Sequence, residues 1–167
     1  MKRQSIGTLL KQYEALVEQL VTIAEGAQTT AATLRKLSHV TDGWITTCVS
    51  LNPNTPSDVL EKQLKSAPGA DGTDVETRIH IAGNPALREK IVRAILVNDP
   101  SLDVRGAALL ALAKRVTTRT DVTASQLWGL YGCALKFEMH SVKRASGIKN
   151  VLLRHPRFPH GKLKKKK

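Results

Sequence analysis

The amino-acid sequence predicts an all-α protein, and three observations lead to that prediction. Aromatic residues make up only 4% of the 167 residues, so the core must be built from Leu, Ile, Val and Ala, which suits packed helices. Apolar residues recur at spacings of three and four along most of the chain. No segment alternates between apolar and polar residues for long enough to indicate a strand.

The first three helices follow from this spacing and from the residues that interrupt it. Residues 4–25 carry an apolar stripe, and Gly26 comes next, which predicts one amphipathic helix that ends there. Thr29 or Thr30 is positioned to cap a second, short helix that runs to about residue 39. After a Thr-Asp-Gly turn, residues 43–51 form an apolar third helix.

Proline-containing breaks separate the later helices. We expect Thr55 to be the N-cap of a helix that has Pro56 at its first position and runs to about residue 65. In the same way, Asn84 is expected to cap a helix that Pro85 opens. The remaining helices are predicted at residues 74–82, 85–97, 102–115, 122–137 and 141–154.

A repeat underlies these breaks. Residues 41–64 and 73–96 each start with Thr-Asp, break at Asn-Pro ten residues after the Asp, and end in Leu, with an offset of 32. A third unit begins at Leu102, but it has Lys-Arg-Val at residues 114–116 in place of the Asn-Pro break. Because one helix pair cannot bury its apolar face alone, we expect the pairs to stack and share a core.

The repeat resembles the leucine-rich repeat variant family and, more broadly, HEAT-like α-solenoids. The resemblance implies a short right-handed α-solenoid of HEAT-like repeats. Its domain would span residues 1–155, with cap helices in 1–40 and repeats in 41–155, followed by a disordered basic tail at 156–167. The known iron–sulfur member of the family needs a cysteine cluster, which Cys48 and Cys133 do not supply. We therefore expect no cofactor. The residues that carry the resemblance are Asn52-Pro53-Asn54-Thr55-Pro56, Val59, Leu60, Leu64, Asn84-Pro85, Asp99-Pro100 and Asp103-Val104-Arg105.

The net charge of +12 lies entirely in the C-terminal part of the chain. Residues 1–100 hold eleven Lys or Arg and eleven Asp or Glu, whereas residues 101–167 hold fifteen and three. Such an excess attracts polyanions, so we expect nucleic acid, DNA more than RNA, bound through its phosphates. The neutral N-terminal half is left for a protein partner or self-association. The expected nucleic-acid-binding residues are Lys114, Arg115, Arg119, Lys136, Lys143, Arg144, Lys149, Arg154, Arg157, Lys162, Lys164, Lys165, Lys166 and Lys167.

Other functions find little support in the sequence. No apolar run is long enough to span a membrane, and neither metal-ligand spacing nor a nucleophile motif is present, so we expect a non-enzymatic protein. The absence of a recognisable signal peptide and the two cysteines favour the cytoplasm. Two alternatives stay open: an adaptor for an acidic protein partner, and a HEAT-like DNA glycosylase that would use Asp121, Trp128 and Tyr131.

Overall fold

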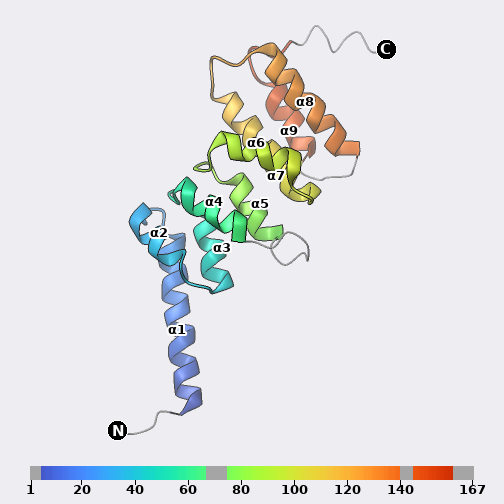
Figure 1. Ribbon diagram of the computed structural model, residues 1–167. Coiled ribbons are helices and arrows are strands. Elements are labelled where there is room, and N and C mark those ends of the chain that lie inside the picture. The colour runs from blue at the N-terminus through green and yellow to red at the C-terminus, as the bar shows by residue number, and fades with distance from the viewer. Residues whose placement is uncertain (1–4, 67–74, 140–144, 160–167) are drawn as a thin grey trace.

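The computed structural model describes residues 5–66, 75–139 and 145–159 (Figure 1). Within these residues the chain forms nine α-helices and no strand, which confirms the all-α prediction. Each predicted helix has its counterpart, with ends that differ by a few residues. The helices are α1 (Ile6–Glu25), α2 (Ala31–Leu37), α3 (Gly43–Leu51), α4 (Ser57–Ser66), α5 (Val75–Gly83), α6 (Glu89–Asn98), α7 (Leu102–Thr117), α8 (Ala124–Met139) and α9 (Ala145–Leu153).

The N-terminal helices begin at side chains that satisfy free backbone N–H groups. The Ser5 hydroxyl accepts from the third residue of α1, and the Thr30 hydroxyl does the same for α2. Of the two candidates for the second cap, Thr30 is therefore the one used. At α3 the Asp42 carboxylate accepts from two N–H groups, at 2.9 and 3.2 Å, where a negative charge also favours the helix dipole.

Two apolar clusters hold the helices together. The smaller joins the C-terminal end of α1 to α2, α3 and α4, and its most enclosed members include Ala24, Leu34 and Ile45. The larger runs from α4 to residue 158 and is centred on α7, which contacts α5, α6, α8 and α9. Alanine fills much of α7, so neighbouring helices approach it from several sides. The N-terminal half of α1 projects away from both clusters (Figure 1).

Two Asn-Pro corners join consecutive helix pairs through the same set of hydrogen bonds. The Asn52 Nδ2 donates to the carbonyls of Ala24 at 2.7 Å and Gly26 at 3.0 Å, at the end of α1. The Asn84 Nδ2 donates to the carbonyls of Ser50 at 2.8 Å and Asn52 at 2.9 Å, at the end of α3. Both side chains are buried, and the Oδ1 of each accepts the N–H two residues further on. The repeat in the sequence therefore corresponds to a repeated contact between helices.

The hydrogen bonds at these corners show that two of the expected helix caps, Thr55 and Asn84, are wrong. Thr55 is not a cap, because its buried Oγ1 donates to the carbonyl of Val49 at 2.6 Å, and α4 begins at Ser57. Asn84 likewise points back to α3, and α6 begins four residues after Pro85. The physical reason is that the carbonyls at these helix ends are buried and need donors, whereas N–H groups at an exposed helix start are satisfied by water.

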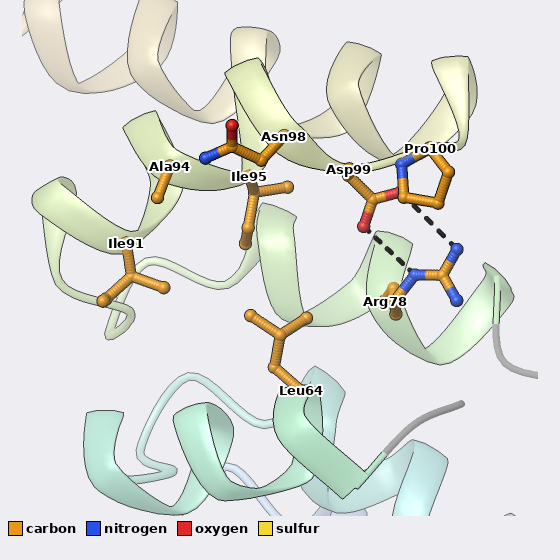
Figure 2. Close-up of a pocket in the computed structure, with 8 residues that line it drawn as sticks. All are labelled: Leu64, Arg78, Ile91, Ala94, Ile95, Asn98, Asp99 and Pro100. Atoms are coloured by element: carbon orange, nitrogen blue, oxygen red, sulfur yellow. Dashed lines mark hydrogen bonds and ion pairs between the residues drawn. The ribbon is translucent and has the colours of Figure 1, made fainter. Parts of the chain in front are cut away.

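Two further residues that precede a proline, Asp99 and His155, accept the N–H two residues on, at 2.9 and 3.1 Å. The Asp99 carboxylate also pairs with Arg78 of α5, with 3.1 Å between Oδ2 and Nε, and the side chains are only 8% and 4% exposed (Figure 2). The His155 Nε2 lies 3.2 Å from the carbonyl of Arg119. Because a carbonyl only accepts, we assign the ring proton to Nε2.

The folded part of the chain continues past α9. Phe158 is 3% exposed and packs against Trp128 and Tyr131 of α8, with ring centroids 5.2–5.4 Å apart. Phe158, which lies in the segment that the sequence analysis assigned to the basic tail, therefore belongs to the larger cluster. Residues 160–167 of that tail lie outside the described residues.

Candidate nucleic-acid interface

The end of α7, the turn before α8 and the segment after α9 meet at one corner of the protein. The His155 ring of the last segment is bonded to the carbonyl of Arg119 in the turn, and α7 also contacts α9 directly. The cationic residues in these three segments include Lys114, Arg119, Arg154 and Arg157, all exposed. We call this set the basic corner.

Arg119 is the member of the basic corner that carboxylates neutralise. Its Nε and Nη2 donate to the two oxygens of Asp121 at 2.9 and 2.6 Å, and its Nη1 lies 3.4 Å from a Glu89 oxygen. The hydrogen bonds from Arg119, reinforced by the charge of Arg157, lower the pKa of Asp121 to about 2. Asp121 is thus ionised at neutral pH and offsets Arg119, so the excess charge at the corner comes from the other three cations.

The exposed cations Lys114, Arg154 and Arg157 form no ion pair among the described residues. In the N-terminal half the arrangement is different, because each described arginine pairs with a carboxylate. The pairs are Arg35–Asp58, Arg78–Asp99, Arg88–Glu61 and Arg93–Glu89. The described arginines of the first half are therefore paired with carboxylates, whereas at the basic corner Arg119 is paired and Arg154 and Arg157 form no ion pair among the described residues.

Arg115, an expected phosphate ligand, points inward instead. Its Nη2 donates to the carbonyls of Asn84 at 3.0 Å and Pro85 at 3.2 Å, at the end of α5. Burial lowers the pKa of the Arg115 guanidinium from its usual value. Arg115 lies 31 residues after Asn84 and does for α5 what Asn84 does for α3. The sequence analysis missed this role and expected a phosphate ligand, although Arg115 lies in the segment that replaces the third Asn-Pro break of the repeat.

The remaining described candidates do not all gather at the basic corner. Lys136 is exposed but lines a groove with Leu102 and Arg105, at the opposite end of α7. The groove lies about 15–20 Å from the corner, given the rise of an α-helix. Lys149 on α9 is half-buried. The other expected residues, Lys143, Arg144, Lys162, Lys164, Lys165, Lys166 and Lys167, lie outside the described residues.

The residues considered for base-excision chemistry have other partners. Asp121 is bound by Arg119 at the exposed turn, and Trp128 and Tyr131 stack on each other and on Phe158 in an edge-to-face cluster. Trp128 Nε1 is enclosed and has no hydrogen-bond partner within the part of the chain that the structure describes. Among the described residues, no three His, Cys, Asp or Glu side chains lie close enough together to hold a metal ion.

Comparison with known proteins adds no assignment: no family model, curated protein or solved structure matches this chain. Of the helices in the described ranges, none has both the length and the apolar character needed to cross a membrane. The class of protein is thus defined by the fold alone, as an all-helical chain of linked helix pairs with a basic C-terminal part.

Proposed function

We propose that this protein binds nucleic acid, duplex DNA in preference to RNA, through the phosphates and without catalysis. The observation that carries the proposal is the contrast in charge pairing. Every described arginine of the N-terminal half forms an ion pair with a carboxylate, whereas Arg154 and Arg157 at the basic corner are exposed and form none among the described residues. A cluster of exposed positive charges that outnumbers the nearby carboxylates attracts a polyanion.

Contacts of this kind position a protein on the nucleic-acid backbone but do not read bases. Lysine and arginine at helix ends and turns are typical phosphate ligands. We therefore expect affinity that depends steeply on salt and little on sequence. Arg115 is left out of the interface because its guanidinium is used inside the fold.

The proposal includes a view of the architecture as a short right-handed α-solenoid related to HEAT-like or leucine-rich repeat variant proteins. Its support is the corner contact that recurs at Asn52, Asn84 and Arg115, each linking one helix pair to the pair before it. The C-terminal third of α1, which packs on α3 through Ala24, would be the cap. The cytoplasmic location of the protein stays a prediction, which the free thiols of Cys48 and Cys133 support.

The test is fluorescence anisotropy of a labelled 20-base-pair duplex with the full chain over a salt series. Arg154→Glu/Arg157→Glu reverses two charges at the basic corner. Lys62→Glu/Lys65→Glu reverses two exposed charges on α4 and serves as the matched control. We expect the corner variant to bind at least about tenfold more weakly, and the control to stay within about threefold of the unmodified chain.

Two results would oppose the proposal. Equal loss in both variants would mean that only the total charge matters, and no binding at low salt would remove nucleic acid as a partner. A competitor of ten glutamates separates the alternatives: if it displaces the duplex at comparable charge concentration, an acidic protein partner is the better assignment. Single-stranded RNA of matched length tests the preference for DNA.

A further inference from the structure

Helix α1 exposes an apolar stripe along the half that projects from the protein. Ile6 is 77% exposed, Leu9 50% and Leu16 52%, although their residue types favour burial. The same helix is covered only near its end, where Ala24 is buried and Leu20 is half-buried against the smaller cluster. The stripe therefore starts inside the fold and continues beyond it.

The spacing of this stripe is that of a helix–helix seam. Apolar residues follow one another at alternating intervals of three and four, which is the heptad pattern that packs one helix along another. A helix that only covers a globular core does not need this strict alternation of three- and four-residue intervals. The members of the seam are Ile6, Leu9, Tyr13, Leu16, Leu20 and Ile23.

The flanks of the seam indicate which partner fits it. The residues beside it are uncharged: Ser5, Gln12 and Gln19 on one side, Leu10 and Val17 on the other. A basic or an acidic partner helix therefore gains no charge pairing there, and a second copy of the same helix meets no like charge. The charged residues of the projecting half, Lys11 and Glu14, lie away from the seam.

We propose that two copies of this chain dimerise through antiparallel α1 helices. With the crossing point near Lys11, Ile6 of one copy faces Leu16 of the other, and Leu9 faces Tyr13, because these pairs are equidistant from the centre. The arrangement also brings each Ile6 beside the groove that Tyr13, Val17 and Trp44 line in the other copy, with Glu14 and Glu18 at the same groove. Trp44 is exposed at the start of α3 and contributes apolar surface there.

The available surface is sufficient for a modest dimer. The exposed apolar side chains within the overlap, Ile6, Leu9, Leu10, Tyr13 and Leu16, present on the order of 600 Å² per copy, so a pair that covered them fully would bury on the order of 1,200 Å², the lower end for specific interfaces. A patch of this size is also at the upper limit of what a monomer normally exposes.

The test is sedimentation equilibrium of the full chain from about 2 to 200 µM, a range over which a dimer of modest affinity (dissociation constant of about 10 µM, roughly −7 kcal/mol) dissociates measurably. Leu9→Lys/Leu16→Lys places two charges in the seam. Ala15→Lys/Thr22→Lys adds the same charge on the opposite, exposed face and is the matched control. We expect a dimer for the unmodified chain and the control, and at least a tenfold weaker association for the seam variant at equal helix content by circular dichroism.

A second experiment fixes the orientation. In a Cys133→Ser background, Ile6→Cys and Leu16→Cys chains are oxidised alone and mixed, and the antiparallel register predicts a disulfide-linked dimer mainly in the mixture. A chain that stays monomeric at 200 µM, or a dimer unaffected by the seam variant, would overturn the proposal. Equal cross-linking of either chain alone would exclude the antiparallel register. None of these outcomes depends on nucleic-acid binding.

Discussion

Replacing Asn84 by alanine should destabilise this protein strongly, because one side chain there satisfies three backbone groups. Its Nδ2 donates to two carbonyls of the preceding helix end at 2.8 and 2.9 Å, and its Oδ1 accepts the N–H of Ala86 at 2.9 Å. The side chain is 3% exposed, so water does not replace these bonds after substitution. Each lost buried hydrogen bond costs about 1 kcal/mol net, and a stranded buried group costs more. We expect Asn84→Ala to lose about 3 kcal/mol.

The assay is urea unfolding followed by circular dichroism at 222 nm. For a domain of this size the expected loss lowers the urea midpoint by roughly 1.5 M and the melting temperature by roughly 6–12 °C. Asn54→Ala is the matched control, because Asn54 also donates to two carbonyls, those of Ala27 and Thr29, but is exposed. Its expected cost is under about 1 kcal/mol, since water takes over the bonds.

Asn84→Asp provides a second arm with a characteristic pH dependence. A carboxylate cannot donate to the two carbonyls, so the charged form is disfavoured and the pKa of the new group should be raised above its unfolded value of about 3.9. A raised pKa means that the destabilisation is fully present at neutral pH and shrinks as pH falls through the folded-state pKa. Equal stability of the Asn84 and Asn54 alanine variants, or no recovery of Asn84→Asp at low pH, would refute the corner as a source of stability.

Three further predictions address the C-terminal half and the thiols. Asp121→Asn should release Arg119 from its closer carboxylate, with Glu89 at 3.4 Å left, and steepen the dependence of log affinity on log salt by up to about 0.9 in the duplex titration, whereas a catalytic Asp121 would instead be revealed by loss of base release from alkylated DNA. Cys48, whose pKa burial raises to about 11, should react with iodoacetamide at pH 8 far more slowly than a free thiol, a rate measurable by mass spectrometry. Phe158→Ala should cost about 3 kcal/mol in urea unfolding, although it lies in the segment expected to be a disordered tail; a cost near zero would place Phe158 outside the core.

Local features of the sequence were enough to predict the helices. Apolar spacing and proline breaks act within one or two helical turns, so α1 through α9 each had a predicted counterpart. The first residue of each helix was harder to predict, as Thr55 shows. Its hydroxyl is equally suited to cap α4 or to bond the carbonyl of Val49, and only the burial of that carbonyl decides between them.

The positive charge of the candidate interface could be predicted from the sequence, but the residues that form the interface could not. The uneven distribution of charge is a property of the sequence, and it pointed to residues 101–167 as the basic part. Which cations face solvent depends on contacts between distant residues. Arg115 bonds carbonyls about 30 residues earlier in the chain, and Arg119 reaches Glu89 as well as its near neighbour Asp121. Neither partner across that distance can be read from the local sequence.

The sequence by itself determined the all-helical class, the repeat with its Asn-Pro breaks and the location of the positive charge. Each depends on interactions over a few residues or on composition alone. Only the tertiary structure decided that Asn52 and Asn84 bond the preceding helix ends, and that the apolar stripe of α1 extends beyond the fold. The physical reason is that burial, and with it the need for a hydrogen-bond or apolar partner, is set by which distant helices pack together.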